Sequence, residues 1–463
     1  MRLTVRNKLA FCLGAFGKDV VYMLVNSYLL YYYNVVLGMS AAFIGTVLMG
    51  ARVFDALNDP LMGIIVAKTK TRWGRFRPWI MSGTVLNALT IYALFAVPRG
   101  MADSPMRIWM AVFYIAWGVS YTLMDIPFWS MIPAITDPGK DREQLSSLAR
   151  SAAGIGDAVP TVLTMVIVPV LSGTAALSGY WLGFKYWALI IAVVFVVSEL
   201  VFVLNVPEKK PEDMKSVGIG QMFRSLLRND QAMTVVAAVI LVYMALDIVG
   251  NLILYFFQFD LGNTDVYSIF TAGCFISQVI FMMLIPVFRK KVEKLRLFAL
   301  GVLIQIAGFL VLLAFAFSGL YRGAWAVLLI PGIMVYAGYG VLNVMLTIFL
   351  SDSVDYGEAK NGTREESVIF SMQTFTVKLA SGVAAFLSGL AIDWIGLDTK
   401  AAVQSAATIS GLRVWMTIPS AILLVAAFIV FKRFYKLNDE KMAEVQKKIS
   451  SSTAAEDGQQ ELE

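Results

Sequence analysis

The chain of 463 residues contains no histidine, only two cysteines, and few charged residues. Without histidine, the side chain that most often changes charge near neutral pH is absent, so proton chemistry must use carboxylates. Cys12 and Cys274 both lie in apolar stretches, which predicts no disulfide framework. Charged residues make up 15% of the chain and hydrophobic residues 58%. Soluble domains carry about 25% charged residues, so this composition excludes an ordinary soluble protein and indicates a membrane protein.

Apolar windows of about 20 residues, the length that spans a bilayer, recur roughly twelve times. The expected spans are 9–36, 41–66, 78–98, 106–135, 146–171, 184–205, 232–258, 266–288, 296–317, 324–350, 367–395 and 408–432. We therefore predict an all-α membrane protein with an N-terminal six-helix bundle (1–206), a central loop (207–230), a C-terminal six-helix bundle (231–435) and a polar tail (436–463). Two six-span halves are the pattern of a major-facilitator transporter.

Lysine and arginine are concentrated in the loops that follow the even-numbered spans, such as Lys68–Arg77 and Arg289–Arg296. Such loops face the cytoplasm, so the central loop, the tail and both termini are expected to be cytoplasmic, in a cell inner membrane. The same distribution accounts for the net charge of +6 without a nucleic-acid partner. The first apolar run is too long for a cleavable signal and is expected to remain as a span.

Carboxylates within the second span define the central question about function. Asp55 and Asp59 are four residues apart, so on a helix they share one face. Carboxylates in apolar surroundings need a proton, a basic partner or a bound cation. Arg52 precedes Asp55 by one helical turn and either neutralises it or serves in gating. Pro60 and Gly63 are expected to loosen the helix that follows.

The fourth span presents a polar stripe, because Tyr121, Asp125 and Trp129 recur every four residues. Carboxylate, amide and hydroxyl oxygens suit a small hard cation. The oxygen cluster that we expect to hold it consists of Asp55, Asn58, Asp59, Thr122 and Asp125. Trp129 offers a flat face for a sugar ring, with packing as the simpler alternative. Asp19 and Arg150 can form strong charged hydrogen bonds with hydroxyls.

Other polar or aromatic groups have simpler interpretations. Tyr31, Tyr32 and Tyr33 are expected to form an interfacial aromatic belt. The charged run after the tenth span is expected to be a solvated loop, with a cytoplasmic gate as the alternative. The gating candidates are Arg52, Arg72, Arg75, Asp352, Asp355 and Arg364. Asp157 and Asp247 receive no role.

Several motifs, in order along nearly the whole chain, resemble the glycoside–pentoside–hexuronide:cation symporter family, and among its members the melibiose carriers. They are FGKD (Phe16–Asp19), DALNDPLMG (Asp55–Gly63), RWGRFRPW (Arg72–Trp79), MDIPFWS (Met124–Ser130), DSVDYGE (Asp352–Glu358) and QTFTVK (Gln373–Lys378). The resemblance implies a major-facilitator fold and coupled uptake of sugar and cation. It implies a cation site at Asp55, Asn58, Asp59 and Asp125, with Thr122 nearby. Its sugar site would be Lys18, Asp19, Asp125, Trp129, Arg150 and Lys378.

Two positions depart from the melibiose carriers, which have tyrosine in place of Asn26 and tryptophan in place of Asn343. Both would lie near the sugar. The amide at Asn58 matches the carriers that use sodium. The resemblance thus predicts a sodium-coupled galactoside symporter, with lithium or protons as other coupling ions, no cofactor, and a functional monomer in the lipid bilayer.

Three alternatives remain open at this point. A proton-coupled carrier of another glycoside, pentoside or glucuronide would show no stimulation by sodium. A membrane sugar sensor would bind sugar without turnover, although the short tail lacks a signalling domain. An intramembrane enzyme is disfavoured, because the spans contain neither paired metal ligands nor a histidine base.

Overall fold

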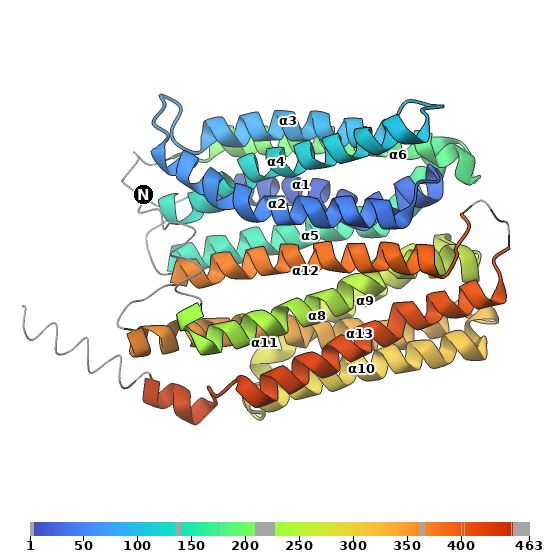
Figure 1. Cartoon of the computed structure of the whole chain (residues 1–463). Coiled ribbons are helices and arrows are strands. Elements are labelled where there is room, and N and C mark those ends of the chain that lie inside the picture. The colour runs from blue at the N-terminus through green and yellow to red at the C-terminus, as the bar shows by residue number, and fades with distance from the viewer. Residues whose placement is uncertain are drawn as a thin grey trace, which may run out of the picture. The chain divides into compact units, whose positions relative to one another are not determined.

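The computed structural model describes residues 4–135, 140–174, 176–208, 227–361, 366–399, 401, 403–445 and 447. Within them the chain forms twelve long helices and no β-strand, apart from an isolated bridge between Thr71 and Gly74 (Figure 1). The helices are α1 (Val5–Tyr31), α2 (Ala41–Lys68), α3 (Arg77–Phe95), α4 (Asp103–Ile135), α5 (Lys140–Ser172), α6 (Tyr180–Asn205), α8 (Asp230–Tyr255), α9 (Asp265–Phe288), α10 (Lys294–Ser318), α11 (Leu329–Asn361), α12 (Glu366–Trp394) and α13 (Ala406–Phe434). Each expected span lies on one of them, so the all-α prediction is confirmed.

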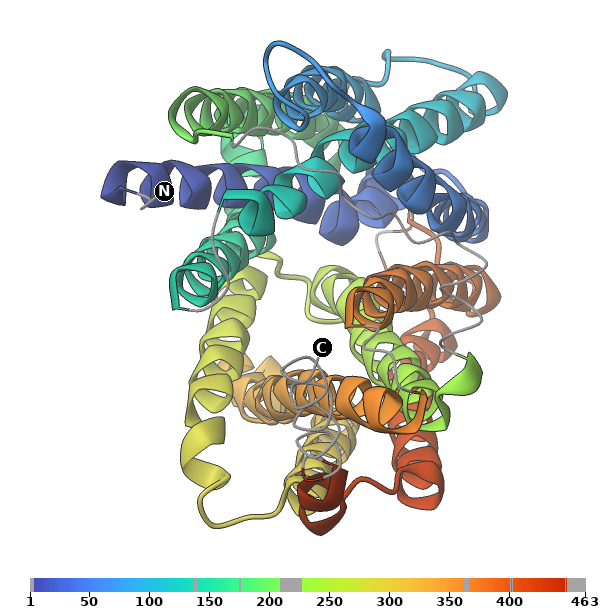
Figure 2. The same ribbon diagram turned by 90° about the vertical axis from the view of Figure 1, so that its left-hand side faces the viewer.

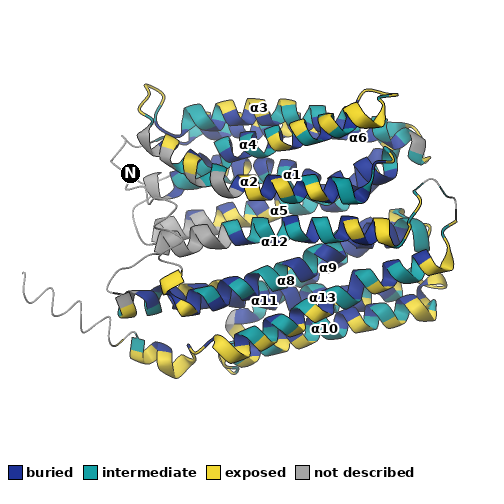
Figure 3. Cartoon of the chain, in the orientation of Figure 1, coloured by how far each residue is buried: buried dark blue, intermediate teal, exposed yellow. Residues whose placement is uncertain are grey.

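Within the described residues, eleven of these helices are long and apolar enough to cross a membrane. Their sides differ in exposure, as Figure 3 shows along each helix. On α6, for example, the exposed Val193, Val197 and Leu204 lie on one face, while Phe195 and Phe202 are buried on another. Exposed apolar side chains in such a stripe are suited to contact with lipid tails.

The chain divides into two compact units. The first comprises Met1–Ser216, Leu254–Ala272 and Ala385–Thr408, and the second comprises Val217–Ile253, Gly273–Ala384 and Ile409–Glu463. In the first unit α1 lies against α5 and α6, α3 packs on α4 and α6, and α2 packs on α4 (Figure 2). In the second unit α10 packs along α11.

The start of α2 is held by a carboxylate from the end of α12, within the first unit. Asp393 accepts hydrogen bonds from the Ser40 hydroxyl at 2.7 Å and from the backbone N–H groups of Ala41 and Ala42 at 3.2 Å. These N–H groups have no partner inside the helix, and a negative charge there also interacts favourably with the helix dipole. Close packing of the same two helices accompanies this contact, since Gly45 and Gly389 leave no room for a side chain.

The tyrosine triplet at the end of α1 does not form the expected aromatic belt. Tyr31, Tyr32 and Tyr33 are 1%, 0% and 0% exposed. Their hydroxyls donate to the Gln258 side chain and to the backbone carbonyls of Phe95 and Leu94. The expectation was wrong because neighbouring segments of the first unit cover these rings and supply acceptors, which a linear pattern cannot indicate.

The expected loosening at Pro60 and Gly63 is also absent, because α2 continues as one α-helix to Lys68. Proline removes one backbone hydrogen bond from a helix. In an apolar environment, unwinding the helix would leave several more groups unpaired, so continuing the helix is the less costly solution.

The basic loop between α2 and α3 is built around the carboxylate of Glu208, which follows α6. Glu208 accepts the backbone N–H of Arg75 at 2.5 Å and that of Phe76 at 3.2 Å. Gly74 has φ +109°, and a Cβ there would come within 2.1 Å of a Glu208 carboxylate oxygen. The loop therefore joins the start of α3 to the end of α6. Its basic residues were expected mainly to set the orientation of the chain in the membrane.

We expect Gly74→Ala to lower the thermal unfolding temperature of the purified protein, at a cost of about 2 kcal/mol from backbone strain and the displaced carboxylate. Gly100→Ala is the matched control, because Gly100 also has a positive φ (+79°) but faces open space. Equal losses for the two variants would contradict a specific role for the contact with Glu208.

Candidate functional site

The two carboxylates of α2 face α4 in register. The Thr122 hydroxyl donates to Asp59 at 2.8 Å, and a Cβ on Gly118 would lie 3.2 Å from a carboxylate oxygen of Asp55. One helical turn thus separates Asp55 from Asp59 on α2, and one turn separates Gly118 from Thr122 on α4. Asn58 lies between the two acids in sequence and is half-buried.

Arg52 supplies the positive charge beside Asp55. Its guanidinium lies 3.5 Å from the Asp55 carboxylate, and both side chains are less than a tenth exposed. The same guanidinium is 3.4 Å from the Tyr22 hydroxyl. Of the two interpretations given for Arg52, these contacts favour neutralisation of Asp55, because an uncompensated carboxylate buried at this depth would be costly.

Lys18, on α1, holds the acids of the candidate sugar site. Its Nζ lies 2.5 Å from Asp19 and 2.8 Å from Asp125, while its side chain is 3% exposed. The Tyr121 hydroxyl is 3.3 Å from the same nitrogen and donates to Asp19 at 3.2 Å. One buried cation therefore compensates two carboxylates from different helices.

The indole of Trp129 is not an open platform in this conformation. The Arg150 guanidinium lies 4.0 Å from its ring centroid, and Lys18 Nζ lies 4.8 Å from it. Cations are attracted to the negative face of an aromatic ring, most strongly to tryptophan. A sugar that stacks on this ring must therefore displace or share the space of the exposed Arg150 side chain.

Glycines allow the helices around Lys18 to approach closely. A Cβ on Gly17 would lie 1.7 Å from the Ser198 hydroxyl oxygen of α6. A Cβ on Gly156 of α5 would meet the Phe16 carbonyl oxygen at 2.5 Å and Asp19 Cβ at 3.3 Å. Small residues at such crossings are what permit close packing of helices in membranes.

Two further acids belong to this network, and the sequence analysis gave neither a role. Asp157, next to Gly156, interacts electrostatically with Asp19, Lys18 and Arg150. Glu199 of α6 is fully buried, and neither of its carboxyl oxygens has a hydrogen-bond partner among the described residues. The signal that could have identified Glu199 is simple: it is an ionisable residue within an apolar span.

The carboxylates expected to bind a cation each have another polar partner in this structure. Within the described part of the chain, no three acidic or cysteine side chains lie close enough together to hold a metal ion. Instead Asp55 pairs with Arg52, Asp59 with Thr122, and Asp125 with Lys18. A cation that joins Asp59 to Asp125 must therefore compete with Lys18.

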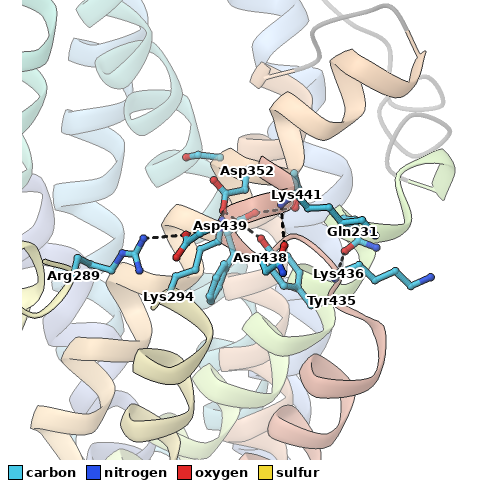
Figure 4. Close-up of polar contacts among 12 residues, drawn as sticks. Gln231, Arg289, Lys294, Asp352, Tyr435, Lys436, Asn438, Asp439 and Lys441 are labelled. Atoms are coloured by element: carbon cyan, nitrogen blue, oxygen red, sulfur yellow. Dashed lines mark hydrogen bonds and ion pairs between the residues drawn. The ribbon is translucent and has the colours of Figure 1, made fainter. Parts of the chain in front are cut away.

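The second unit contains Lys378, Asp352 and Asp355 among the remaining candidates. Lys378 is half-buried on α12. Asp352 accepts from Lys294 at 2.6 Å and from the Tyr435 hydroxyl at 3.4 Å, within the cluster of Figure 4. Burial raises the pKa of Tyr435, which keeps its hydroxyl a donor.

This cluster connects the ends of several elements. Asp439, after α13, lies 3.1 Å from Arg289 and 3.8 Å from Lys294 (Figure 4). Asp355 is half-buried on α11, Arg72 is exposed, and Arg75 is buried. Arg364 lies outside the described residues.

Because Lys18 compensates two acids, we expect the loss of Lys18 to destabilise the protein more than the loss of one of these acids. Lys18→Met leaves two uncompensated carboxylates and should destabilise the protein by about 3–5 kcal/mol. Asp125→Asn leaves Lys18 paired with Asp19 and should cost clearly less. Thermal unfolding of both purified variants tests this expectation, and an equal loss for the two would contradict the shared role of Lys18.

Comparisons with known proteins agree with this architecture. A family model described as "MFS/sugar transport protein" matches residues 10–439. The isoprimeverose transporter of Lactiplantibacillus pentosus is 27% identical over 98% of this chain and 93% of its own length. The raffinose carrier protein of Pediococcus pentosaceus is 28% identical over 95% of this chain and 71% of its own.

Among solved structures, a bacterial homolog of the human lysosomal transporter Spinster superposes with a TM-score of 0.70. The match covers 94% of this chain and 98% of the other at 12% identity, so it bears on the fold alone. It agrees with the fold expected from two groups of six spans.

Proposed function

Since the chain belongs to the MFS/sugar transport family, and within it to the glycoside–pentoside–hexuronide symporters, we propose that it imports a galactoside such as melibiose together with sodium. The family makes the chain a multi-pass membrane sugar transporter and not an enzyme. The relatives named for isoprimeverose and raffinose support a glycoside as the substrate class. We further propose an inner-membrane monomer with both termini cytoplasmic, since the basic loops favour that topology.

The observation that carries the proposal is the position of Asp125 between two sets of partners. It pairs with Lys18, which also holds Asp19, and it lies three residues after Thr122, which holds Asp59. Sodium bound by Asp59, Thr122 and Asp125, with Asp55 and Asn58 beside them, would draw Asp125 away from Lys18. Lys18 and Asp19 would then be free to bond sugar hydroxyls, with Trp129, Arg150 and Lys378 as the other sugar ligands.

This change of partner at Asp125 would couple the binding of sodium to the binding of sugar. If sodium prepares the sugar site, sugar must raise the affinity for sodium by the same factor. Alternating access would then move the loaded site from one side of the membrane to the other. Asp352, Asp355 and Arg364, with Arg52, Arg72 and Arg75, remain our candidates for gating.

A proton-coupled carrier is the second candidate, and the buried Glu199 favours it. Among the described residues its carboxyl oxygens have no hydrogen-bond partner, so this acid is a candidate carrier of the coupling proton. Lithium is a further coupling ion that the same oxygen ligands would accept.

Calorimetry of melibiose binding to the purified protein, at constant pH, separates these candidates. We expect replacement of choline by sodium to lower the Kd about tenfold or more, which corresponds to a coupling of about 1.4 kcal/mol. Binding indifferent to sodium would favour protons. If no binding occurs in either salt, the galactoside assignment fails, and sugars named for the relatives should be tested next.

We expect Asp59→Cys to abolish the stimulation by sodium while sugar still exchanges down its gradient, because the cation loses a charged ligand and the sugar ligands stay intact. Asp103→Asn is the control, since Asp103 is an exposed acid at the start of α4 that pairs with Arg107 one turn away. Counterflow in liposomes with and without sodium measures both effects. Full sodium stimulation in Asp59→Cys would overturn the proposed cation site.

A further inference from the structure

Within the first unit, Arg52 lies between two acceptors, a carboxylate of its own helix and a phenol of α1. One guanidinium nitrogen is 3.5 Å from the Asp55 carboxylate, and another is 3.4 Å from the Tyr22 hydroxyl oxygen. A guanidinium group can only donate, so the Tyr22 hydroxyl is the acceptor in this contact. Both distances exceed the usual hydrogen-bond length of about 2.9–3.0 Å. The guanidinium is therefore shared between Asp55 and Tyr22, and a small movement would tighten it on either one.

The ring of Tyr22 offers the guanidinium a second kind of contact. Arg52 Cζ lies 5.6 Å from the ring centroid, within the range of a cation–π interaction. Two buried aromatic side chains of α4 pack against the same ring, with centroid distances of 6.0 Å for Trp117 and 5.2 Å for Tyr121. This packing holds the phenol in place beside Arg52.

Tyr22 also lies next to the Lys18 network. Lys18 precedes Tyr22 by one turn of α1, so the two side chains share a face of that helix. The Tyr121 ring that packs on Tyr22 carries its hydroxyl 3.3 Å from Lys18 Nζ. Tyr22 therefore separates two buried cations, Arg52 and Lys18, which pair with different carboxylates.

The binding of sodium would change what Arg52 needs. In the proposed mechanism the ion lies beside Asp55, so it competes with Arg52 for this carboxylate. A buried arginine needs a partner in every state of the protein, because an uncompensated charge at this depth is costly. The Tyr22 hydroxyl already touches the guanidinium, and its oxygen and aromatic face together can hold the cation after Asp55 has turned to sodium.

We propose that Tyr22 is a positioning residue of the cation site, which receives Arg52 when sodium binds at Asp55. Tyr22 thereby lowers the cost of separating Arg52 from that carboxylate and raises the affinity for sodium. This inference rests on the proposed function and deepens it, since it names a residue outside the set of sodium ligands that sets the strength of sodium binding. Tyr22 acts through Arg52 and does not itself contact the ion.

Tyr22→Phe tests this role, because it removes the hydroxyl and keeps the ring. The measurement is the unfolding temperature of the purified protein while sodium replaces choline at constant pH and ionic strength, which requires no sugar. We expect the sodium concentration that gives half of the maximal stabilisation to rise about threefold to tenfold, the value of a hydrogen bond to a charged group. The Kd for melibiose in choline should stay within about twofold, because the proposed sugar ligands are unchanged.

Tyr28→Phe is the matched control, since it makes the same change on the same helix. The Tyr28 hydroxyl donates to the backbone carbonyl of Thr161 at 2.8 Å, so its loss should leave the half-saturating sodium concentration unchanged. In an Arg52→Gln background, Tyr22→Phe should have no further effect, because the charge that the hydroxyl receives is gone. If Arg52→Gln folds poorly, the comparison of Tyr22→Phe with Tyr28→Phe decides.

Each other outcome contradicts the proposal. An unchanged half-saturating concentration in Tyr22→Phe, or an equal rise in Tyr28→Phe, would overturn the role of Tyr22 while leaving a sodium site in place. Weaker melibiose binding in choline with a normal response to sodium would make Tyr22 a sugar ligand instead. A parent protein that sodium does not stabilise would reject the proposed cation site, and the role of Tyr22 with it.

Discussion

The first unit depends on one compensation of charge, the pairing of Lys18 with Asp19 and Asp125. A cation buried among apolar helices is stable only with partners, and so are the carboxylates around it. This requirement brings α1 and α4 to the same point, and the Tyr121 hydroxyl completes the polar contacts there. The network is enclosed because α1 lies close to α5 at Gly156 and close to α6 at Gly17.

The same compensation leaves the network responsive to ligands. Lys18 cannot satisfy Asp125 fully while a cation also binds this acid, so any ion that enters redistributes the bonds around Asp19. In the second unit a buried charge is likewise compensated, since Lys294 pairs with Asp352.

Local patterns were sufficient to predict much of this protein. The twelve spans follow from hydropathy over about 20 residues, a property of each segment by itself. The common face of Asp55 and Asp59 and the stripe from Tyr121 to Trp129 follow from the helical period. Pairing of Arg52 with Asp55 was one of two interpretations. It could be predicted because the two residues lie on adjacent turns of one helix.

Contacts between helices could not be predicted in this way, because they depend on which segments become neighbours. Only the tertiary structure buried Tyr31–Tyr33 and Glu199 and brought Arg150 over Trp129. It also joined Gly74 to Glu208, 134 positions further along the chain. The sequence by itself determined which residues are helical and which carry charge. The tertiary structure decided which charges pair, since the low dielectric of the bundle makes each burial depend on the partner that packing supplies.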